Sequence, residues 1–324
     1  MDEIEFEDVV LRTRNPFVLT DHVASDAGDA IDLPAGFYRS ATTPPPWLAV
    51  VVSEGLGGVK TARERRYGRF LAQHGCAALV IDSFAARGHA GSIHPVRAMN
   101  VTETMMVVDA FAGLRWLARH ADVASDRIHH IGFSYGGMIA TLTAYEQLRR
   151  HFIGEDPLRF AGHVSYYGPT VPRLEDPTTT GAPVTILNAE RDANLNRERL
   201  DAIVTDLRRG GSRVASIIFP GAWHQWDSDD HERRFDPFNL HDGKTSILRD
   251  GTIVDETRGR IVGGYLSRLL MLARSVSLKG FHLRRDEAVM RRSDEILLAT
   301  IGVDGRAAER HEVTSGGQRM EAVT

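Results

Sequence analysis

Short runs of apolar residues alternate along this chain with longer segments of helical periodicity. The run Trp47–Ser53 is rich in valine, which is typical of a strand buried on both faces of a sheet. Residues 76–81 and 128–132 have the same character, and residues 101–120 between them carry apolar side chains three or four positions apart. Strands and helices that alternate in this way form a mainly parallel sheet covered on both faces. We therefore expect an α/β fold with a doubly wound sheet.

The rest of the chain continues this alternation up to a change in composition. We expect further strands at residues 4–11, 36–40, 160–167, 184–188 and 214–219, and helices at residues 61–74, 135–150, 196–210 and 260–274. Residues 227–249 fit the pattern poorly because they are polar, and beyond Ser277 the chain is strongly charged. These features predict one α/β domain over residues 1–276 and an appended arm or tail over residues 277–324.

Charge and cysteine content exclude several classes of protein. The 324 residues carry 39 Lys and Arg against 43 Asp and Glu, a formal net charge of −4. This balance favours neither nucleic acid nor an anionic membrane surface as a partner. The apolar runs are strand-sized, far short of the roughly 20 residues of a membrane span. Cys76 is the only cysteine, and residues 1–5 are acidic rather than leader-like, so we expect a cytoplasmic protein.

A Gly-x-Ser-x-Gly pattern at residues 132–136 lies between a predicted strand and a predicted helix. This is the setting of a nucleophile elbow, in which the central residue, here Ser134, lies on a sharp turn. Gly132 and Gly136 lack the Cβ atoms that would keep the strand and the helix apart. The start of the helix also directs backbone N–H groups toward charge that develops on a substrate. Ser134 is therefore the candidate nucleophile; the alternative is an ordinary glycine-rich turn.

A serine nucleophile needs a base, and the base needs a carboxylate that orients it. In this fold the acid follows the serine along the chain, and the histidine comes last. Asp192 lies a few residues into the loop after the strand at residues 184–188 and is the better candidate. Glu190, in the same loop, is the second candidate; the alternative for both is a solvated loop charge without a catalytic role.

The candidate base is His224, which follows the strand at residues 214–219 and is bracketed by aromatic residues. It lies where the fold requires the catalytic histidine, after the last strand of the sheet. The other histidines considered are His231 and His241 in the polar segment, and His129 and His130 on the strand before Ser134, where packing or a satisfied hydrogen bond is expected.

Two backbone N–H groups are expected to form an oxyanion hole. One belongs to Tyr135, the residue after the nucleophile, and the other comes from the loop after the strand Trp47–Ser53. That loop begins at Glu54, so the amide of Gly55 is the candidate for the second donor. Each such donor is typically worth about 3 kcal/mol in the transition state.

Four stretches of the chain, in this order, resemble the dienelactone hydrolase family. They are VVVSEGLGG at residues 50–58, AALVIDSFAARG at 77–88, IGFSYGG at 131–137 and PGAWH at 220–224. The resemblance covers roughly residues 33–274. It implies an α/β-hydrolase fold without a large lid and the hydrolysis of small esters or lactones without a cofactor. The type enzyme uses a cysteine nucleophile, whereas Ser134 stands at that position here, as in many relatives.

The resemblance also implies roles for two charged residues. A glutamate of the type enzyme contacts the nucleophile, and Glu54 matches its position, so a tuning role is implied; a loop carboxylate that caps the following turn is the alternative. The type enzyme binds its substrate carboxylate with arginines, and Arg87 lies near one of those positions, offset by one residue. That offset puts dienelactone itself in doubt as the substrate.

Aromatic side chains near the predicted triad are candidate walls of a substrate pocket. They are Phe84, Tyr135, Trp223 and Trp226. No metal is implied, because the histidines do not pair with cysteine or carboxylates at ligand spacing, and His89 and His94 read as loop residues.

The function predicted from these residues is hydrolysis of a small-molecule ester or lactone through an acyl-enzyme on Ser134. Two alternatives stay open. A tailoring enzyme would use the same residues for C–C bond hydrolysis, cyclisation or acyl transfer, and a non-catalytic protein would only bind a small molecule. For residues 227–249 and the tail after Ser277, three roles stay open: closing over the site, binding a partner, or exchange within a homo-oligomer.

Overall fold

The computed structural model describes residues 4–24, 30–274 and 276–303. Its centre is a twisted sheet of eight strands in the order β1-β2-β4-β3-β5-β6-β8-β9. These strands are β1 (Ile4–Thr13), β2 (Ile31–Ser40), β3 (Trp47–Ser53), β4 (Ala77–Ile81), β5 (Val123–Phe133), β6 (Gly162–Tyr166), β8 (Val184–Ala189) and β9 (Val214–Phe219). From β4 to β9 neighbouring strands are parallel, and β1 and β2 form an antiparallel edge. The prediction of a mainly parallel sheet is confirmed.

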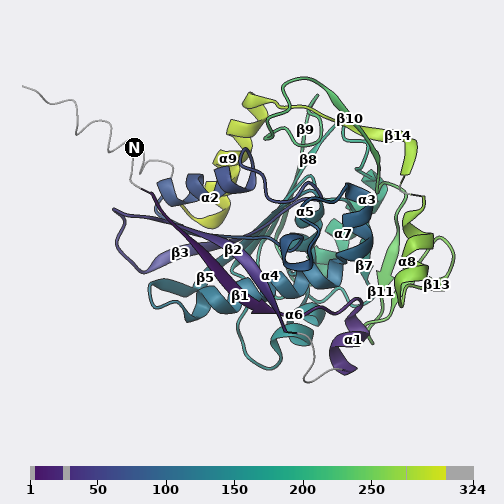
Figure 1. Cartoon of the computed structure of the whole chain (residues 1–324), viewed down its shortest axis with the longest axis horizontal. Coiled ribbons are helices and arrows are strands. Elements are labelled where there is room, and N and C mark those ends of the chain that lie inside the picture. Colours follow the sequence, from purple (N-terminus) through teal and green to yellow (C-terminus); the bar gives the residue numbers. More distant parts are fainter. Residues whose placement is uncertain (1–3, 25–29, 275, 304–324) are drawn as a thin grey trace, which may run out of the picture.

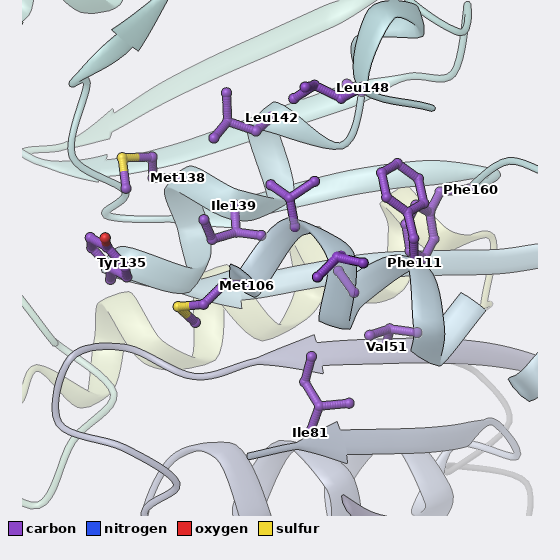
Figure 2. Packing of buried hydrophobic residues seen from close by; sticks show 14 of the residues in the cluster. Val51, Ile81, Met106, Phe111, Tyr135, Met138, Ile139, Leu142, Leu148 and Phe160 are labelled. Carbon is purple, nitrogen blue, oxygen red and sulfur yellow. The ribbon is translucent and has the colours of Figure 1, made fainter. Parts of the chain in front are cut away.

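Helices cover both faces of this sheet (Figure 1). They are α2 (Glu64–Gln73) and α9 (Glu287–Ile301) on one face, and α4 (Glu103–Arg119), α5 (Tyr135–Leu142), α6 (Glu146–Ile153) and α7 (Arg197–Arg209) on the other. Successive side chains of a strand point to opposite faces. Val50 and Val52 of β3 accordingly belong to the core under α2 and α9, and Val51 belongs to the other core. In that second core Phe111 of α4 stacks on Phe160 (Figure 2).

Two predicted elements differ from the structure. The expected helix at residues 135–150 is broken into α5 and α6, because the carbonyl of Ala144 accepts from the amide of Thr180 instead of continuing the helix. Around the predicted loop residues His89 and His94, the chain forms the short helices η1 (Ala85–Arg87) and α3 (His94–Asn100). His94, predicted as a loop residue, is the first residue of α3, and the proline after it suits the first turn of a helix.

The polar residues after β9 fold into small sheets beside the main one. β7 (Pro172–Leu174), β11 (Thr245–Ile247), β12 (Ile253–Asp255) and β13 (Arg260–Ile261) form a four-stranded sheet. The expected helix at residues 260–274 is shorter, α8 (Tyr265–Leu272). β10 (Arg234–Phe238) pairs with β14 (Val276–Leu283) in a separate antiparallel pair, the β10–β14 ribbon. A short helix, α1 (Leu19–Ala24), precedes β2.

The described part of the predicted tail packs on the main sheet. β14 joins the ribbon, and α9 lies beside α2 (Figure 1), where Arg66 and Asp294 form an ion pair. Leu297 and Ile301 of α9 are buried in the core on that face. The predicted boundary after residue 276 stays a prediction, and residues 304–324 of the predicted tail lie outside the described residues. In the described ranges, none of the helices combines the length and the apolar content of a membrane span.

Candidate active site

Ser134 lies on the sharp turn between β5 and α5, as predicted for a nucleophile elbow. Its φ of 52° is in the left-handed region, which is strained for a residue with a side chain. A Cβ added at Gly132 would lie 2.0 Å from the carbonyl oxygen of Gly136, and one added at Gly136 would lie 2.3 Å from the carbonyl oxygen of Ser53. Both glycines are therefore required by the close approach of backbone around Ser134.

The structure brings Ser134, His224 and Asp192 together in a hydrogen-bonded chain. The Nε2 atom of His224 lies 3.0 Å from the Oγ atom of Ser134, and its Nδ1 atom lies 2.6 Å from Oδ2 of Asp192. His224 and Asp192 are buried, whereas Ser134 is half-buried. An ionised Asp192 can only accept, so the proton of the neutral imidazole lies on Nδ1 and Nε2 is free to accept from the serine.

The alternatives to these residues lie elsewhere. Glu190 accepts from the backbone amide of Gly221 at 2.8 Å, and the Nδ1 atom of His241 lies 2.9 Å from Asp242. His231 lies in an exposed turn of the polar segment. None of these side chains contacts Ser134 within the described residues.

Two aromatic rings that sequence reasoning missed pack against His224. The ring of Phe281, on β14, meets the imidazole edge-on at 4.8 Å between centroids, and Tyr167 lies at 4.7 Å. The residue after β14 also contacts the loop that carries His224, since the amide of Arg284 donates to the carbonyl of His224 at 3.2 Å. No sequence pattern links residues this far apart, so only the fold reveals the contact.

The predicted oxyanion donors, Tyr135 and Gly55, both lie next to Ser134. The amide of Tyr135 begins α5, where the first N–H groups of a helix have no intrahelical partner. A Cβ added at Gly55 would lie 3.2 Å from the Cβ atom of Ser134. The Gly55 amide, however, donates to Oε1 of Glu64 at 3.3 Å, a long hydrogen bond that the prediction did not include. Glu64 is itself buried and pairs with Arg63 at 2.7 Å.

The side chain of Tyr135 is held away from solvent by two charged residues. Its phenol donates to Glu103 of α4 at 2.7 Å and accepts from Arg268 of α8 at 3.0 Å. Arg268 also pairs with Glu103 at 2.7 Å and donates to the carbonyl of Ala98 at the end of α3. Burial and the adjacent Glu103 raise the pKa of Tyr135 well above its ordinary value, so the phenol stays protonated.

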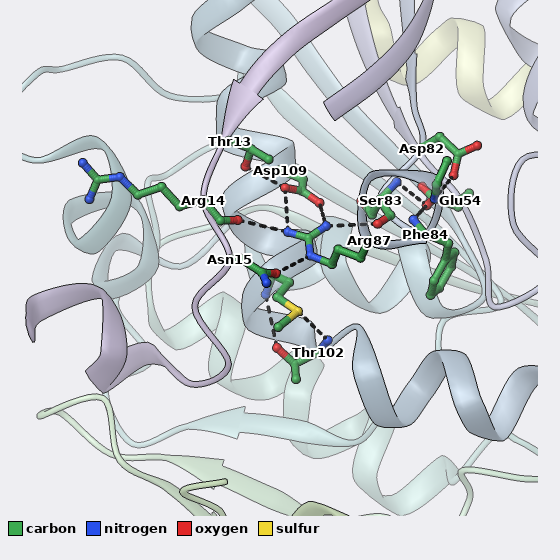
Figure 3. A network of polar contacts seen from close by, with 12 residues as sticks. Thr13, Arg14, Asn15, Glu54, Asp82, Ser83, Phe84, Arg87, Thr102 and Asp109 are labelled. Carbon is green, nitrogen blue, oxygen red and sulfur yellow. Dashed lines mark hydrogen bonds and ion pairs between the residues drawn. The ribbon is translucent and has the colours of Figure 1, made fainter. Parts of the chain in front are cut away.

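Glu54 is fully buried at the end of β3. Its Oε1 atom accepts from the amides of Ser83 at 2.7 Å and Phe84 at 3.3 Å (Figure 3). Its Oε2 atom has no hydrogen-bond partner in the described part of the chain, and no hydrogen bond joins it to Ser134. Burial and the charge of Asp82 raise the pKa of Glu54 well above its ordinary value, which favours a neutral carboxyl group.

The structure contradicts a substrate-binding role for Arg87. Its guanidinium pairs with the buried Asp109 at 2.7 Å and donates to the side chain of Asn15 at 2.7 Å and the carbonyl of Arg14 at 3.0 Å (Figure 3). All three nitrogens are thus bound within the protein, and the side chain is 4% exposed. Arg87 thus ties the residues after β1 to Asp109 of α4.

The predicted aromatic walls divide into buried and accessible residues. Phe84, Tyr135 and Trp226 are fully buried, so the prediction that their side chains line a pocket is wrong. Trp226 instead donates to the hydroxyl of Ser293 on α9 at 3.1 Å, which links the loop that carries His224 to that helix. Trp223 is half-buried, with its ring against the side chain of Arg233.

His130 has the satisfied hydrogen bonds expected of it. Its ring nitrogens lie 2.9 Å from the hydroxyl of Ser53 and 2.7 Å from that of Thr143. His129 is buried, and burial lowers its pKa to about 4. Across residues 4–24, 30–274 and 276–303, no three His, Cys, Asp or Glu side chains gather into a metal-binding cluster.

Comparisons with known proteins identify the family and the fold of the chain. The model of the dienelactone hydrolase family matches residues 35–241. No curated protein matches the sequence. Among solved structures, a protein described as a dienelactone hydrolase from Klebsiella pneumoniae subsp. pneumoniae MGH 78578 is 21% identical with a TM-score of 0.53, and the match covers 69% of this chain and 89% of that one. A dienelactone hydrolase-like promiscuous phosphotriesterase from metagenomic libraries is 16% identical with a TM-score of 0.50, over 68% and 84% of the two chains. The predicted α/β-hydrolase fold is confirmed.

Proposed function

The chain belongs to the dienelactone hydrolase family, and on that premise we propose that it is a serine-dependent hydrolase. It cleaves a small ester or lactone through an acyl-enzyme on Ser134. The observation that carries this proposal is the hydrogen-bonded chain from Ser134 through His224 to Asp192. A binding protein would have no need for a strained serine, a buried histidine and a buried carboxylate in contact.

In the acylation step, Oγ of Ser134 attacks the substrate carbonyl while its proton passes to Nε2 of His224. The new C–O bond places the electron pair of the carbonyl on its oxygen. When the tetrahedral intermediate collapses, the ester C–O bond breaks and the proton on Nε2 goes to the leaving oxygen. Asp192 stays ionised throughout and stabilises the imidazolium that forms between these two transfers.

Deacylation repeats these steps with water in place of the serine. Water gives a proton to Nε2 of His224 and attacks the acyl carbon, after which the bond to Ser134 breaks and its Oγ recovers the proton. Phe281 and Tyr167 pack on the ring of His224 and keep its orientation through both halves of the cycle.

Two amides are proposed to stabilise the oxyanion. The N–H of Tyr135 is directed by the start of α5, and the N–H of Gly55 is the second donor. The hydrogen bond from Gly55 to Glu64 is long, and the nearby Arg63 neutralises that carboxylate. A developing oxyanion is a stronger acceptor than a carboxylate already paired with arginine, so the Gly55 amide turns to it as the intermediate forms.

The charges around the site favour a substrate without a carboxylate. Arg87 is bound to Asp109 and Arg268 to Glu103, so neither cation is free for an anionic substrate. Glu54, kept neutral by burial, adds no charge and instead holds the amides after β4 in place beside the nucleophile.

Hydrolysis of simple aryl esters tests the proposal. Purified wild-type protein should release the phenol from an aryl acetate or butyrate, and Ser134→Ala and His224→Ala should each lose about 10³-fold or more in kcat. His241→Ala is the matched control, because the ring of this histidine lies against Asp242 and makes no hydrogen bond to Ser134 in the described part of the chain, and it should keep wild-type turnover. No turnover by the wild type, or wild-type turnover by Ser134→Ala, contradicts the proposal.

A further inference from the structure

The inward face of the β10–β14 ribbon covers the candidate active site. Asp236 on β10 and Phe281 on β14 are directly paired in the antiparallel register. Side chains of such cross-strand partners lie on the same face of the pair. Because the ring of Phe281 packs on His224, the side chain of Asp236 is on the face that looks toward the catalytic histidine. Their neighbours Phe235 and His282 contact each other on the opposite face.

The pKa of Asp236 agrees with this placement. Burial alone would raise it, but the hydrogen bonds from His94 and from the backbone amide of Phe238, with the charges of His94 and His224, leave the pKa of Asp236 below its ordinary value. The carboxylate is therefore ionised and electrostatically coupled to His224.

His94, the first residue of α3, reaches Asp236 on β10. Its Nδ1 atom lies 2.7 Å from Oδ2 of Asp236, and the two side chains are 23% and 14% exposed. They are thus neither sealed in the core nor fully in water. An ionised carboxylate at Nδ1 keeps a proton there, as Asp192 does for His224. The Nε2 atom of His94 has no hydrogen-bond partner within the described residues.

The charge of this pair limits what it can recognise. With His94 neutral the pair carries one negative charge, and with His94 protonated it carries none, so it never presents net positive charge to a substrate. A carboxylate is therefore a poor ligand. The neutral tautomer offers the lone pair of Nε2, which accepts from a hydroxyl or amine.

We propose that His94, oriented by Asp236, accepts a hydrogen bond from a hydroxyl or amine group on the substrate and so determines its specificity. The inference rests on the proposed function, because it names the class of ester or lactone that Ser134 attacks. The preferred substrate carries a hydrogen-bond donor away from the scissile carbonyl. His94 is half-buried, so a bound substrate displaces water from Nε2, and a substrate that lacks this donor leaves the acceptor unpaired.

Matched aryl esters test this inference. The series comprises an aryl butyrate, its derivatives with a hydroxyl at the second, third or fourth carbon, and the aryl monoester of succinate. The wild type should turn over at least one hydroxy ester with a kcat/KM about tenfold above the butyrate, the value expected of one hydrogen bond of ~1.4 kcal/mol. It should not prefer the succinate ester.

Two variants test whether the pair of His94 and Asp236 causes the preference for the hydroxy ester. An asparagine at position 94 keeps an N–H for Asp236 and lacks the equivalent of Nε2, so His94→Asn should bring the ratio of kcat/KM for hydroxy ester to butyrate close to one. Asp236→Asn should lower the ratio in part. His241→Asn, an exposed histidine elsewhere, should keep the wild-type ratio. Because each ratio is taken within one variant, a general loss of activity does not change it.

The outcomes separate this inference from the proposed function. If no hydroxy ester is preferred, if the succinate ester is preferred, or if His94→Asn keeps the preference, the role of His94 is wrong. Butyrate hydrolysis that depends on Ser134 would still support the hydrolase. Absence of any ester turnover by the wild type overturns both.

Discussion

The phenol of Tyr135 donates a hydrogen bond of 2.7 Å to the carboxylate of Glu103, and this contact fixes the residue next to the nucleophile from the side-chain end. Tyr135 follows Ser134 directly, so its own amide is the first proposed oxyanion donor. Arg268 of α8, in the segment that follows the main sheet, donates a hydrogen bond to the phenol oxygen. The position of one backbone N–H is therefore tied to α4 and α8, which lie far from it in the sequence.

Removing the hydroxyl group of Tyr135 should affect kcat much more than KM. We expect Tyr135→Phe to lower kcat on an aryl ester roughly tenfold, part of the ~10²-fold that loss of an oxyanion donor costs, with KM nearly unchanged. Tyr265→Phe is the control, since Tyr265 is exposed on α8. Steady-state kinetics measures kcat and KM for both variants. Equal kcat values would contradict the proposal that the hydroxyl of Tyr135 positions its backbone amide.

Glu54 should make the protein less stable as the pH rises. Its pKa is raised in the folded state, whereas an unfolded glutamate ionises near ~4.3. Above that pH the folded chain keeps a proton that the unfolded chain releases, so the free energy of unfolding falls with rising pH. Glu54→Gln removes this loss. Its melting temperature relative to the wild type should rise as the pH increases above ~4.3.

Glu103 should affect the pH dependence of stability in the opposite direction from Glu54. Burial would raise its pKa, but the charge and hydrogen bonds of Arg268 lower it. The stability from this pair is present above ~4.3 and is lost as the pH falls through the folded pKa. Glu103→Gln should therefore destabilise the protein more at pH 7 than near pH 3. Parallel pH dependence in the two variants would contradict these assignments.

Arg87 should matter for stability and not for substrate binding. Arg87→Met leaves Asp109 buried without its partner, which costs about 3–5 kcal/mol in the free energy of unfolding. Adding Asp109→Asn should recover part of this loss. Urea unfolding measures it, and the ratio of KM values for aryl succinate and butyrate should match the wild type. Unchanged stability with a raised KM for the succinate ester would indicate that Arg87 binds the substrate.

The order of strands, the elbow and the triad residues could be read from the sequence because each depends on local pattern. Ser134, Asp192 and His224 each follow a buried strand, and strand ends of a parallel sheet meet at one edge. The partners of these residues carry no such signal. Phe281, on β14 of the β10–β14 ribbon, packs on His224, and Asp109 forms a buried ion pair with Arg87. The break near Ala144 likewise depends on Thr180, a hydrogen bond that local periodicity cannot show.

The central claim is that Ser134 forms a covalent intermediate, and labelling by a serine-directed aryl phosphonate followed by peptide mass spectrometry tests it most directly. The wild type should gain one phosphonyl group, on the peptide that contains Ser134. Ser134→Ala should gain none, and Asp192→Asn should react much more slowly than His241→Ala, because its histidine is no longer held in the right tautomer. A label on another residue, or equal labelling of Ser134→Ala, would contradict the account.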